Sequence, residues 1–227
     1  MLKKLTWYRI VRALTPIAYA VLLVKGYMSK NLAYMIILLS ATLLGGAWFC
    51  GWLCPFGFAQ EWLGKLGRLL RLPRLRLPAK VAKWVNLLRY ILFGLSFLGL
   101  ALVLLIQSPF ASFMGIVDQN MSYISKTAWI LLGTFLGLSL FIDRPFCRYF
   151  CPEGARYGVF SLARLFTITR DEEKCVSCKK CDIKCPSQIE ISTRPAVRNA
   201  QCINCMECIA ACPVKGTLKF SWAFKKK

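Results

Sequence analysis

The chain has 227 residues, 57% of them hydrophobic, and a formal net charge of +21. It contains no histidine, which excludes histidine-ligated haem, copper or iron and catalysis by a histidine general base. The basic residues lie beside apolar runs. We therefore interpret the charge as a signal of membrane topology and of contact with anionic lipid, and we expect no binding of nucleic acid.

Apolar runs in the first two thirds of the chain predict four transmembrane helices. They cover residues 13–28, 32–49, 87–106 and 127–142. Of the 31 Lys and Arg residues, 16 lie in the tail that begins at Asp143, a bias that predicts both termini on the cytoplasmic side. We therefore expect an integral, multi-pass protein of a bacterial or archaeal cytoplasmic membrane.

Residues 58–72, between the second and the third run, have an amphipathic pattern. Trp62, Leu66 and Leu69 fall on one face, and Lys65 and Arg68 fall towards another. This pattern predicts a helix that lies in the plane of the membrane interface, and a solvated basic loop is the alternative.

The frame F-C-x3-C-P-x-G occurs twice, at residues 49–57 and 146–154, each time after an even-numbered apolar run. The repeat predicts two parallel two-helix units related by an axis along the membrane normal. The two frames contain Cys50, Cys54, Cys147 and Cys151, and cysteines four apart share one face of a helix.

Three interpretations of these four cysteines stay open. Their sulfurs could converge at the inner membrane boundary and bind an additional iron–sulfur cluster. They could be redox-active thiols that exchange electrons or hold a metal transiently. They could also be inert, because a buried cysteine often behaves as a small hydrophobic residue.

The last quarter of the chain contains the run C-x2-C-x2-C-x3-C-P twice, starting at Cys175 and at Cys202. In bacterial ferredoxins the first three cysteines of each run bind one [4Fe–4S] cluster and the fourth binds the other cluster. We therefore expect two [4Fe–4S] clusters held by two crossed sets. The first set is Cys175, Cys178, Cys181 and Cys212, and the second is Cys202, Cys205, Cys208 and Cys185. Zinc or disulfides are the alternative.

The predicted fold is therefore mostly α. A transmembrane domain of four helices, made of two parallel two-helix repeats, is expected over residues 1–166. A small α+β ferredoxin domain of the bacterial 2[4Fe–4S] type is expected over residues 167–227. Because cluster cysteines must stay reduced, we expect the ferredoxin domain on the cytoplasmic side.

The two C-x3-C-P frames combined with the two ferredoxin runs resemble the NapH-type membrane ferredoxins, which are related to part of NosR and to the CcoG proteins. The resemblance covers essentially the whole chain. It implies electron transfer between membrane quinones and the other redox subunits of a membrane complex, as in a quinol dehydrogenase. It also implies cofactor binding by the cysteines of the frames and metal binding by the eight cysteines of the runs.

The expected function is therefore that of a membrane-bound iron–sulfur electron-transfer subunit. An assembly factor that reduces or delivers a metal through the frame cysteines is the alternative, and a passive anchor is a third hypothesis. Oxidation of a quinol would also require a proton acceptor. The candidate carboxylates are Glu61, Asp118, Asp143 and Glu153.

Overall fold

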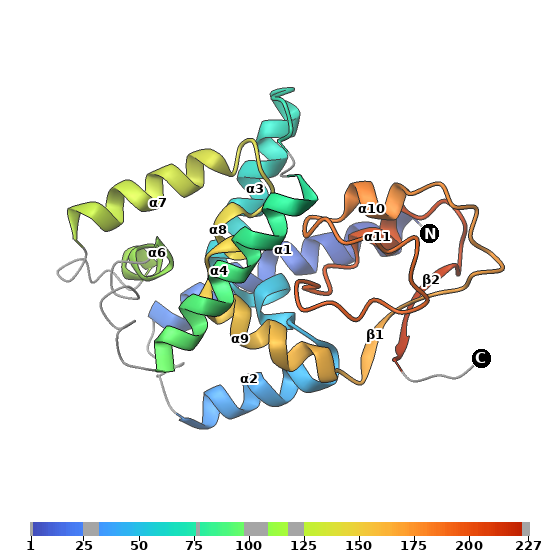
Figure 1. The fold of residues 1–227 in the computed structure, drawn as a ribbon, viewed down its shortest axis with the longest axis horizontal. Coiled ribbons are helices and arrows are strands. Elements are labelled where there is room, and N and C mark those ends of the chain that lie inside the picture. Colours follow the sequence, from blue (N-terminus) through green and yellow to red (C-terminus); the bar gives the residue numbers. More distant parts are fainter. Residues whose placement is uncertain (1, 25–31, 76–77, 98–108, 118–124, 224–227) are drawn as a thin grey trace. The chain divides into compact units, whose positions relative to one another are not determined.

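The computed structural model describes residues 2–24, 32–75, 78–97, 109–117 and 125–223, and most of these residues are helical (Figure 1). The predominance of helix and the small α+β content of the C-terminal part are confirmed. The longer helices are α1 (Leu2–Val24), α2 (Leu32–Gly45), α3 (Pro55–Leu69), α4 (Ala79–Phe97), α6 (Pro109–Val117), α7 (Lys126–Leu138) and α9 (Pro152–Phe160).

Short elements complete the chain between and after these helices. They are the π-helical turn η1 (Phe49–Leu53), α8 (Pro145–Tyr149), the 3-10 turn η2 (Ser161–Ala163), strand β1 (Phe166–Arg170), α10 (Lys180–Lys184), α11 (Glu207–Ala211) and strand β2 (Leu218–Trp222). The described chain forms two compact units, each built from separated segments. The first unit contains Met1–Arg12, Lys30–Trp52 and Arg156–Lys227, and the second contains Ala13–Ser29 and Leu53–Ala155.

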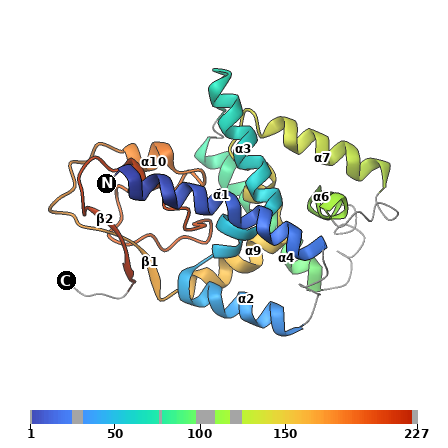
Figure 2. The same cartoon turned by 180° about the vertical axis from the view of Figure 1, so that it is seen from behind.

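The first unit contains the ferredoxin runs. Strands β1 and β2 pair antiparallel, with Phe166 opposite Trp222 and Arg170 opposite Leu218. The strands contribute to an apolar core, which is made of Ile168, Ile189, Ile191, Val197, Leu218, Cys202 and Cys208. The short helices α10 and α11 pack against each other, and the first turns of α1 lie beside them in both views (Figures 1 and 2). The core thus places cysteines of both runs next to buried aliphatic side chains.

In the second unit, α3 buries its glycine face and exposes its apolar face. A Cβ atom at Gly67 would overlap the carbonyl oxygen of Leu140, and one at Gly64 would lie 2.8 Å from Oδ1 of Asp143. This close approach buries Gln60 and Glu61. The apolar residues Trp62, Leu66 and Leu69, which the sequence grouped on one face, are exposed. The prediction of a helix here is therefore confirmed, but the side that packs is the one with the smallest side chains.

The prediction of four transmembrane helices is wrong. Within the described ranges, no helix is both long enough and apolar enough to cross a membrane. A crossing needs about 20 residues, whereas α2 has 14 residues and α7 has 13. Helices α1 and α4 are longer, but α1 contains Arg9 and Arg12 and α4 contains Arg89. Parts of the predicted runs, residues 25–28 and 98–106, lie outside the described residues.

Candidate metal centres

The two ferredoxin runs fold into loops with the same unusual backbone. In the first run, Ser177 and Lys179, on either side of Cys178, have φ angles of 51° and 54°. In the second run, Asn204 and Met206, on either side of Cys205, have φ angles of 47° and 57°. Alternation of left-handed with right-handed residues turns successive backbone N–H groups towards one point, an arrangement that binds anionic groups, including iron–sulfur clusters. Because none of these four residues is glycine, the sequence did not indicate these conformations.

The first centre, which we call the exposed centre, is a cavity lined by Cys175, Cys178, Cys181 and Cys212. This is the first of the two crossed sets expected from the spacing. The cavity contains about 360 Å³ of empty space, part of it open to solvent. Among the twelve cysteines, all of which lie in the described ranges, Cys178 alone is exposed.

The second centre, which we call the buried centre, is a cavity lined by Cys185, Cys202, Cys205 and Cys208. It contains about 300 Å³ of empty space, also partly open, and it is bordered by Ile168, Ile189, Ile191 and Val197 of the core. Cys202, Cys205 and Cys208 are buried. The two centres therefore differ in access, although their loops have the same backbone.

The donor sets suit iron–sulfur clusters better than single ions. Across the described residues, no three Cys, Asp or Glu side chains lie in an arrangement that could hold one metal ion. Each set of four sulfurs instead lines a cavity that is partly open to solvent. Four sulfurs around such a space, with backbone N–H groups turned towards it, fit the thiolate ligation of a [4Fe–4S] cluster.

The thiols differ in acidity within the exposed centre as well as between the two centres. In the exposed centre, burial and the neighbouring Asp182 raise the pKa of Cys181 to about 11. Hydrogen bonds from the Ser177 N–H and from Arg170 lower the pKa of Cys175. Burial raises the pKa of Cys185 to about 12 and also raises that of Cys208. Because a metal ligand must be the thiolate, the buried centre needs the positive charge of bound iron to displace its protons.

The C-x3-C-P frames place Cys54 and Cys151 in equivalent positions, each directly before a helix that begins with proline. The Cys54 thiol caps α3 by accepting the N–H of Gly57 at 3.4 Å, and the Cys151 thiol accepts the N–H of Gly154 at 3.3 Å. Both thiols are buried. Burial, followed by the charge of Cys54, raises the pKa of Cys151 to about 12, and burial raises that of Cys54.

Two buried polar residues, Gln60 and Arg89, interact with the cysteines of the second unit. The side-chain amide of Gln60, which is fully buried, donates from Nε2 to Sγ of Cys147 at 3.5 Å. The buried guanidinium of Arg89 donates to the carbonyl oxygen of Arg148 at 3.2 Å and lowers the pKa of Cys151 against the larger effect of burial. Cys54, Cys147 and Cys151 thus belong to one compact unit, whereas Cys50 belongs to the other.

The first frame also contacts the buried centre within the first unit. A Cβ atom at Gly51 would overlap the carbonyl oxygen of Ile203. Ile203 directly follows Cys202 in the second run. The indole N–H of Trp52 donates to the carbonyl oxygen of Asn204 at 3.2 Å. The residues directly after Cys50 therefore lie against the loop of the buried centre.

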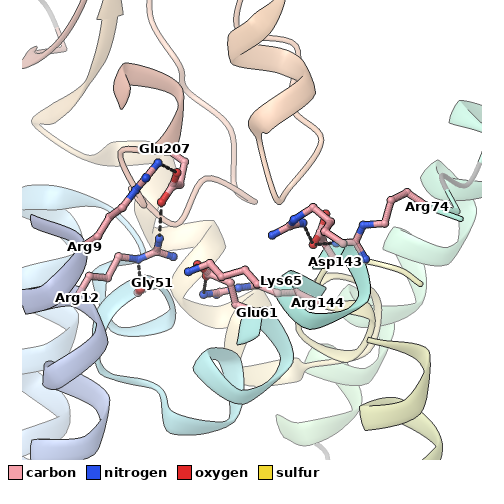
Figure 3. A network of polar contacts seen from close by, with 10 residues as sticks. Arg9, Arg12, Gly51, Glu61, Lys65, Arg74, Asp143, Arg144 and Glu207 are labelled. Atoms are coloured by element: carbon pink, nitrogen blue, oxygen red, sulfur yellow. Dashed lines mark hydrogen bonds and ion pairs between the residues drawn. The ribbon is translucent and has the colours of Figure 1, made fainter. Parts of the chain in front are cut away.

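A buried arginine of α1 bridges the same two segments (Figure 3). Arg12 donates from Nε to the carbonyl oxygen of Gly51 at 3.0 Å, and its Nη1 lies 3.5 Å from Oε1 of Glu207. Arg9 reaches the other oxygen of Glu207 at 3.1 Å. Glu207 lies between Cys205 and Cys208 in the run of the buried centre. No sequence pattern pointed to Arg12, Glu207 or Gln60, because each contacts a residue far away in the chain.

Two of the four carboxylates that were candidate proton acceptors are in ion pairs (Figure 3). Glu61 is buried and contacts Arg144 at 2.5 Å and Lys65 at 3.3 Å. Asp143 contacts Arg68 at 2.9 Å and also Arg74. Asp118 lies outside the described residues, and Glu153 is half-buried in the first turn of α9. The ion pairs give Glu61 and Asp143 a structural role.

Replacing Gly51 by alanine should destabilise the first unit, because the new methyl group must displace the backbone carbonyl of Ile203. Overpacking of this kind costs roughly 1–3 kcal/mol. Chemical denaturation would measure the change. Gly133→Ala is the matched control, since a Cβ at Gly133 meets no atom within 4 Å. It should be neutral or stabilise the protein by up to about 1 kcal/mol. Equal stability of Gly51→Ala and the wild type would contradict the close contact.

The raised pKa values predict that Cys54 and Cys151 react slowly with iodoacetamide, which attacks thiolates. In the native protein at about pH 8, mass spectrometry should show labelling of these two cysteines roughly a hundredfold slower than after unfolding in guanidinium. Labelling should be slower in the native protein because burial raises both pKa values and so keeps both thiols protonated in this pH range. Labelling of either cysteine at the unfolded rate would instead identify it as a reactive thiol.

Two family models match this chain. A model described as a 4Fe–4S binding domain matches residues 31–73 and 127–168, and these two ranges contain the two C-x3-C-P frames. A model described as a 4Fe–4S dicluster domain matches residues 167–218, which contain both ferredoxin runs. Together the models account for both repeated cysteine patterns of the sequence.

Curated relatives agree with the family models. An uncharacterized protein of Methanocaldococcus jannaschii is 35% identical over 206 residues, which cover 90% of this chain and 84% of the relative. The ferredoxin-type protein NapH of Haemophilus influenzae is 31% identical over 66% of this chain and 51% of its own length. The chain belongs to the NapH/NosR-like family of 4Fe–4S proteins.

Another member of the NapH/NosR-like family has a name that concerns electron transport. The putative electron transport protein YccM of Escherichia coli is 37% identical over 76% of this chain and 50% of its own length. The chain thus spans about half the length of YccM and of NapH from Haemophilus influenzae. No solved structure matches the chain.

Proposed function

We propose that this member of the NapH/NosR-like family is an electron-transfer subunit. It would hold two [4Fe–4S] clusters and pass single electrons between a partner redox protein and the region of its C-x3-C-P frames. The family models for 4Fe–4S binding and the relative named as an electron transport protein support an iron–sulfur electron-transfer role. When bound, such clusters accept and release single electrons at potentials set by their surroundings.

The observation that carries the proposal is the composition of the two cavities. Each is lined by one complete set of four cysteines, and each set draws three members from one run and the fourth from the other. A disulfide framework would need the sulfurs in pairs, and a zinc site would need four ligands around one ion. All twelve cysteines are free, and no group of the described residues could hold a single ion.

The chain's own residues give the two centres different surroundings. Access to solvent at Cys178 opens the exposed centre to a partner. Aliphatic residues of the apolar core border the buried centre, and three of its four cysteines are buried. Gly51 and Trp52 then place the first frame directly on the loop of the buried centre, where Arg12 and Glu207 hold it. This arrangement supports a path in which electrons enter at the exposed centre and leave from the buried centre beside Cys50, or follow the reverse direction.

For the four frame cysteines we propose an additional iron–sulfur site. The 4Fe–4S binding model covers both frames, and Cys54 and Cys151 occupy equivalent positions, each directly before a helix that begins with proline. The test is the iron content of a Cys54→Ser, Cys151→Ser variant. A loss of about four irons per chain is expected, and an unchanged content would exclude the additional site.

The proposed partners are other redox subunits and a quinone, on the cytoplasmic side of a membrane complex where thiolates stay reduced. The direct test begins with anaerobic protein reduced by dithionite and then mixed with a water-soluble naphthoquinone. Loss of the reduced iron–sulfur signal, monitored by electron paramagnetic resonance, is expected. Protein that is reduced but not reoxidised would exclude the quinone, and protein that is never reduced would contradict the electron-transfer role itself.

A further inference from the structure

The surface around the exposed centre presents three lysines. Lys179, Lys180 and Lys184 are exposed, and the described residues provide no ion-pair partner for any of them. Lys180 and Lys184 are four residues apart on α10, so they share one face of that helix. Cys178 directly precedes Lys179. The unpaired charges therefore lie beside the one exposed cysteine ligand.

The acidic residues nearby in the chain do not neutralise these lysines. Asp171 contacts Lys174 at 3.3 Å, and Glu172 contacts Arg170 at 3.3 Å. The carboxylate of Asp182 accepts the N–H groups of Ile191 and Ser192 at 2.6 and 3.0 Å. Glu173 is the remaining acidic residue of this stretch, and it is exposed. Three exposed lysines thus lie in a stretch whose acidic side chains Asp171, Glu172 and Asp182 contact other groups.

Exposed apolar side chains occur within the same stretch. Val176 in the loop is 63% exposed, and Ile183 on α10 is 59% exposed. Apolar residues rimmed by charge are typical of protein interaction sites.

In the second ferredoxin run, the position equivalent to Lys180 is contacted by another segment of the chain. In that run Met206 and Glu207 occupy the places of Lys179 and Lys180. Glu207 is contacted by Arg9 and Arg12 of α1, so a basic segment of the same chain binds the run of the buried centre. The first run has the opposite charge at this position and no such segment among the described residues.

We infer that Lys179, Lys180, Lys184, Val176 and Ile183 form the docking surface for a redox protein with an acidic face, which exchanges electrons at the exposed centre. The inference rests on the proposed electron-transfer function and adds the site and the charge of the partner. Charge complementarity at such a surface chiefly accelerates association and makes it sensitive to salt.

The test compares a Lys180→Glu, Lys184→Glu variant with the wild type, using flavodoxin as an acidic one-electron protein. At about 20 mM salt, where screening is weak, the dissociation constant for oxidised flavodoxin and the rate of reduction by reduced flavodoxin are measured. We expect binding and rate to weaken roughly tenfold or more in the variant. The wild-type rate should also fall steeply at about 200 mM salt.

Two controls separate docking from other effects. Reduced methyl viologen, a small donor, should reduce the variant within about twofold of the wild-type rate, because it needs no docking surface. An Arg194→Glu, Lys219→Glu variant changes the net charge equally at two other exposed residues and should keep the flavodoxin rate within about twofold.

Flavodoxin binding and rates that are unaffected by Lys180→Glu, Lys184→Glu, or equally affected by the control variant, would overturn the inference while leaving the proposed function intact. An equal loss of the methyl viologen rate would also overturn it, because the substitutions would then act on the centre itself. Failure of methyl viologen to reduce the wild type would contradict the proposed function, and the docking surface with it.

Discussion

Replacing Cys205 by serine should remove one cluster and destabilise the protein, whereas replacing Cys178 by serine should remove one cluster with a smaller loss of stability. Each change should lower the iron content by about four per chain. Cys205 is buried in the wall of the cavity next to the core, and Cys178 is exposed. A buried serine hydroxyl without a partner costs about 1–3 kcal/mol, in addition to the lost binding free energy of the cluster.

Iron analysis and thermal unfolding of the two variants would measure these effects.

The crossed sets make a sharper prediction for the fourth cysteine of each run. Cys185→Ser should give the same electron paramagnetic resonance spectrum as Cys205→Ser, and Cys212→Ser the same spectrum as Cys178→Ser. If Cys185→Ser instead matched Cys178→Ser, each run would bind its own cluster and the crossed assignment would be wrong.

Replacing Glu61 by glutamine should destabilise the second unit by about 3–5 kcal/mol, because the guanidinium of Arg144 would stay buried without its carboxylate. The two side chains are 9% and 6% exposed and lie 2.5 Å apart. Arg144 has a φ of 52° and precedes Pro145, so its backbone has little freedom to carry the charge to solvent. Urea denaturation at neutral pH would give the change in the free energy of unfolding.

Lys65→Met is the matched control for this pair. Lys65 contacts the same carboxylate at 3.3 Å, but its side chain is 46% exposed, so its loss should cost less than about 1 kcal/mol. A Glu61→Gln variant as stable as Lys65→Met would show that Arg144 is solvated in the folded protein, contrary to the structure.

The spacing of the two runs predicts two crossed sets of four cysteines, and each set lines one cavity of the structure. Their ligation of clusters stays a prediction. The same spacing could not reveal that one centre is exposed and the other buried. That difference depends on Ile168, Ile189, Ile191 and Val197, which come from segments outside the two runs. It also depends on Arg12 of α1, which reaches Glu207 almost two hundred positions later in the chain.

The membrane helices were predicted from runs of apolar residues, and a run does not determine where a helix ends. Helix α2 ends at Gly45, because Gly46 has a φ of 81° that stops the helix. A Cβ at Gly46 would lie 2.9 Å from Nη1 of Arg164 and 2.9 Å from Nδ2 of Asn204, so this turn is packed against polar side chains. Hydropathy counts residues 46–49 as part of the run, although they continue into a different element.

The residues of α3 that pack inside the protein were not predicted. The amphipathic pattern predicted a helix in the plane of a membrane interface, and it did not indicate which of its residues contact the rest of the chain. In this unit the close approach of residues 139–143 instead requires the small residues Gly64 and Gly67. Gln60 and Glu61 are carried into the interior with them, where Gln60 reaches Cys147.

The iron and acid-labile sulfide content of anaerobically purified protein tests the central claim most directly, measured beside a Cys178→Ser, Cys205→Ser double variant. Two [4Fe–4S] clusters in the crossed sets predict at least about eight irons and eight sulfides per wild-type chain, with about eight of each lost in the double variant. Wild-type protein that contains zinc or no metal, or a double variant that keeps its full iron content, would contradict the assignment of the two centres.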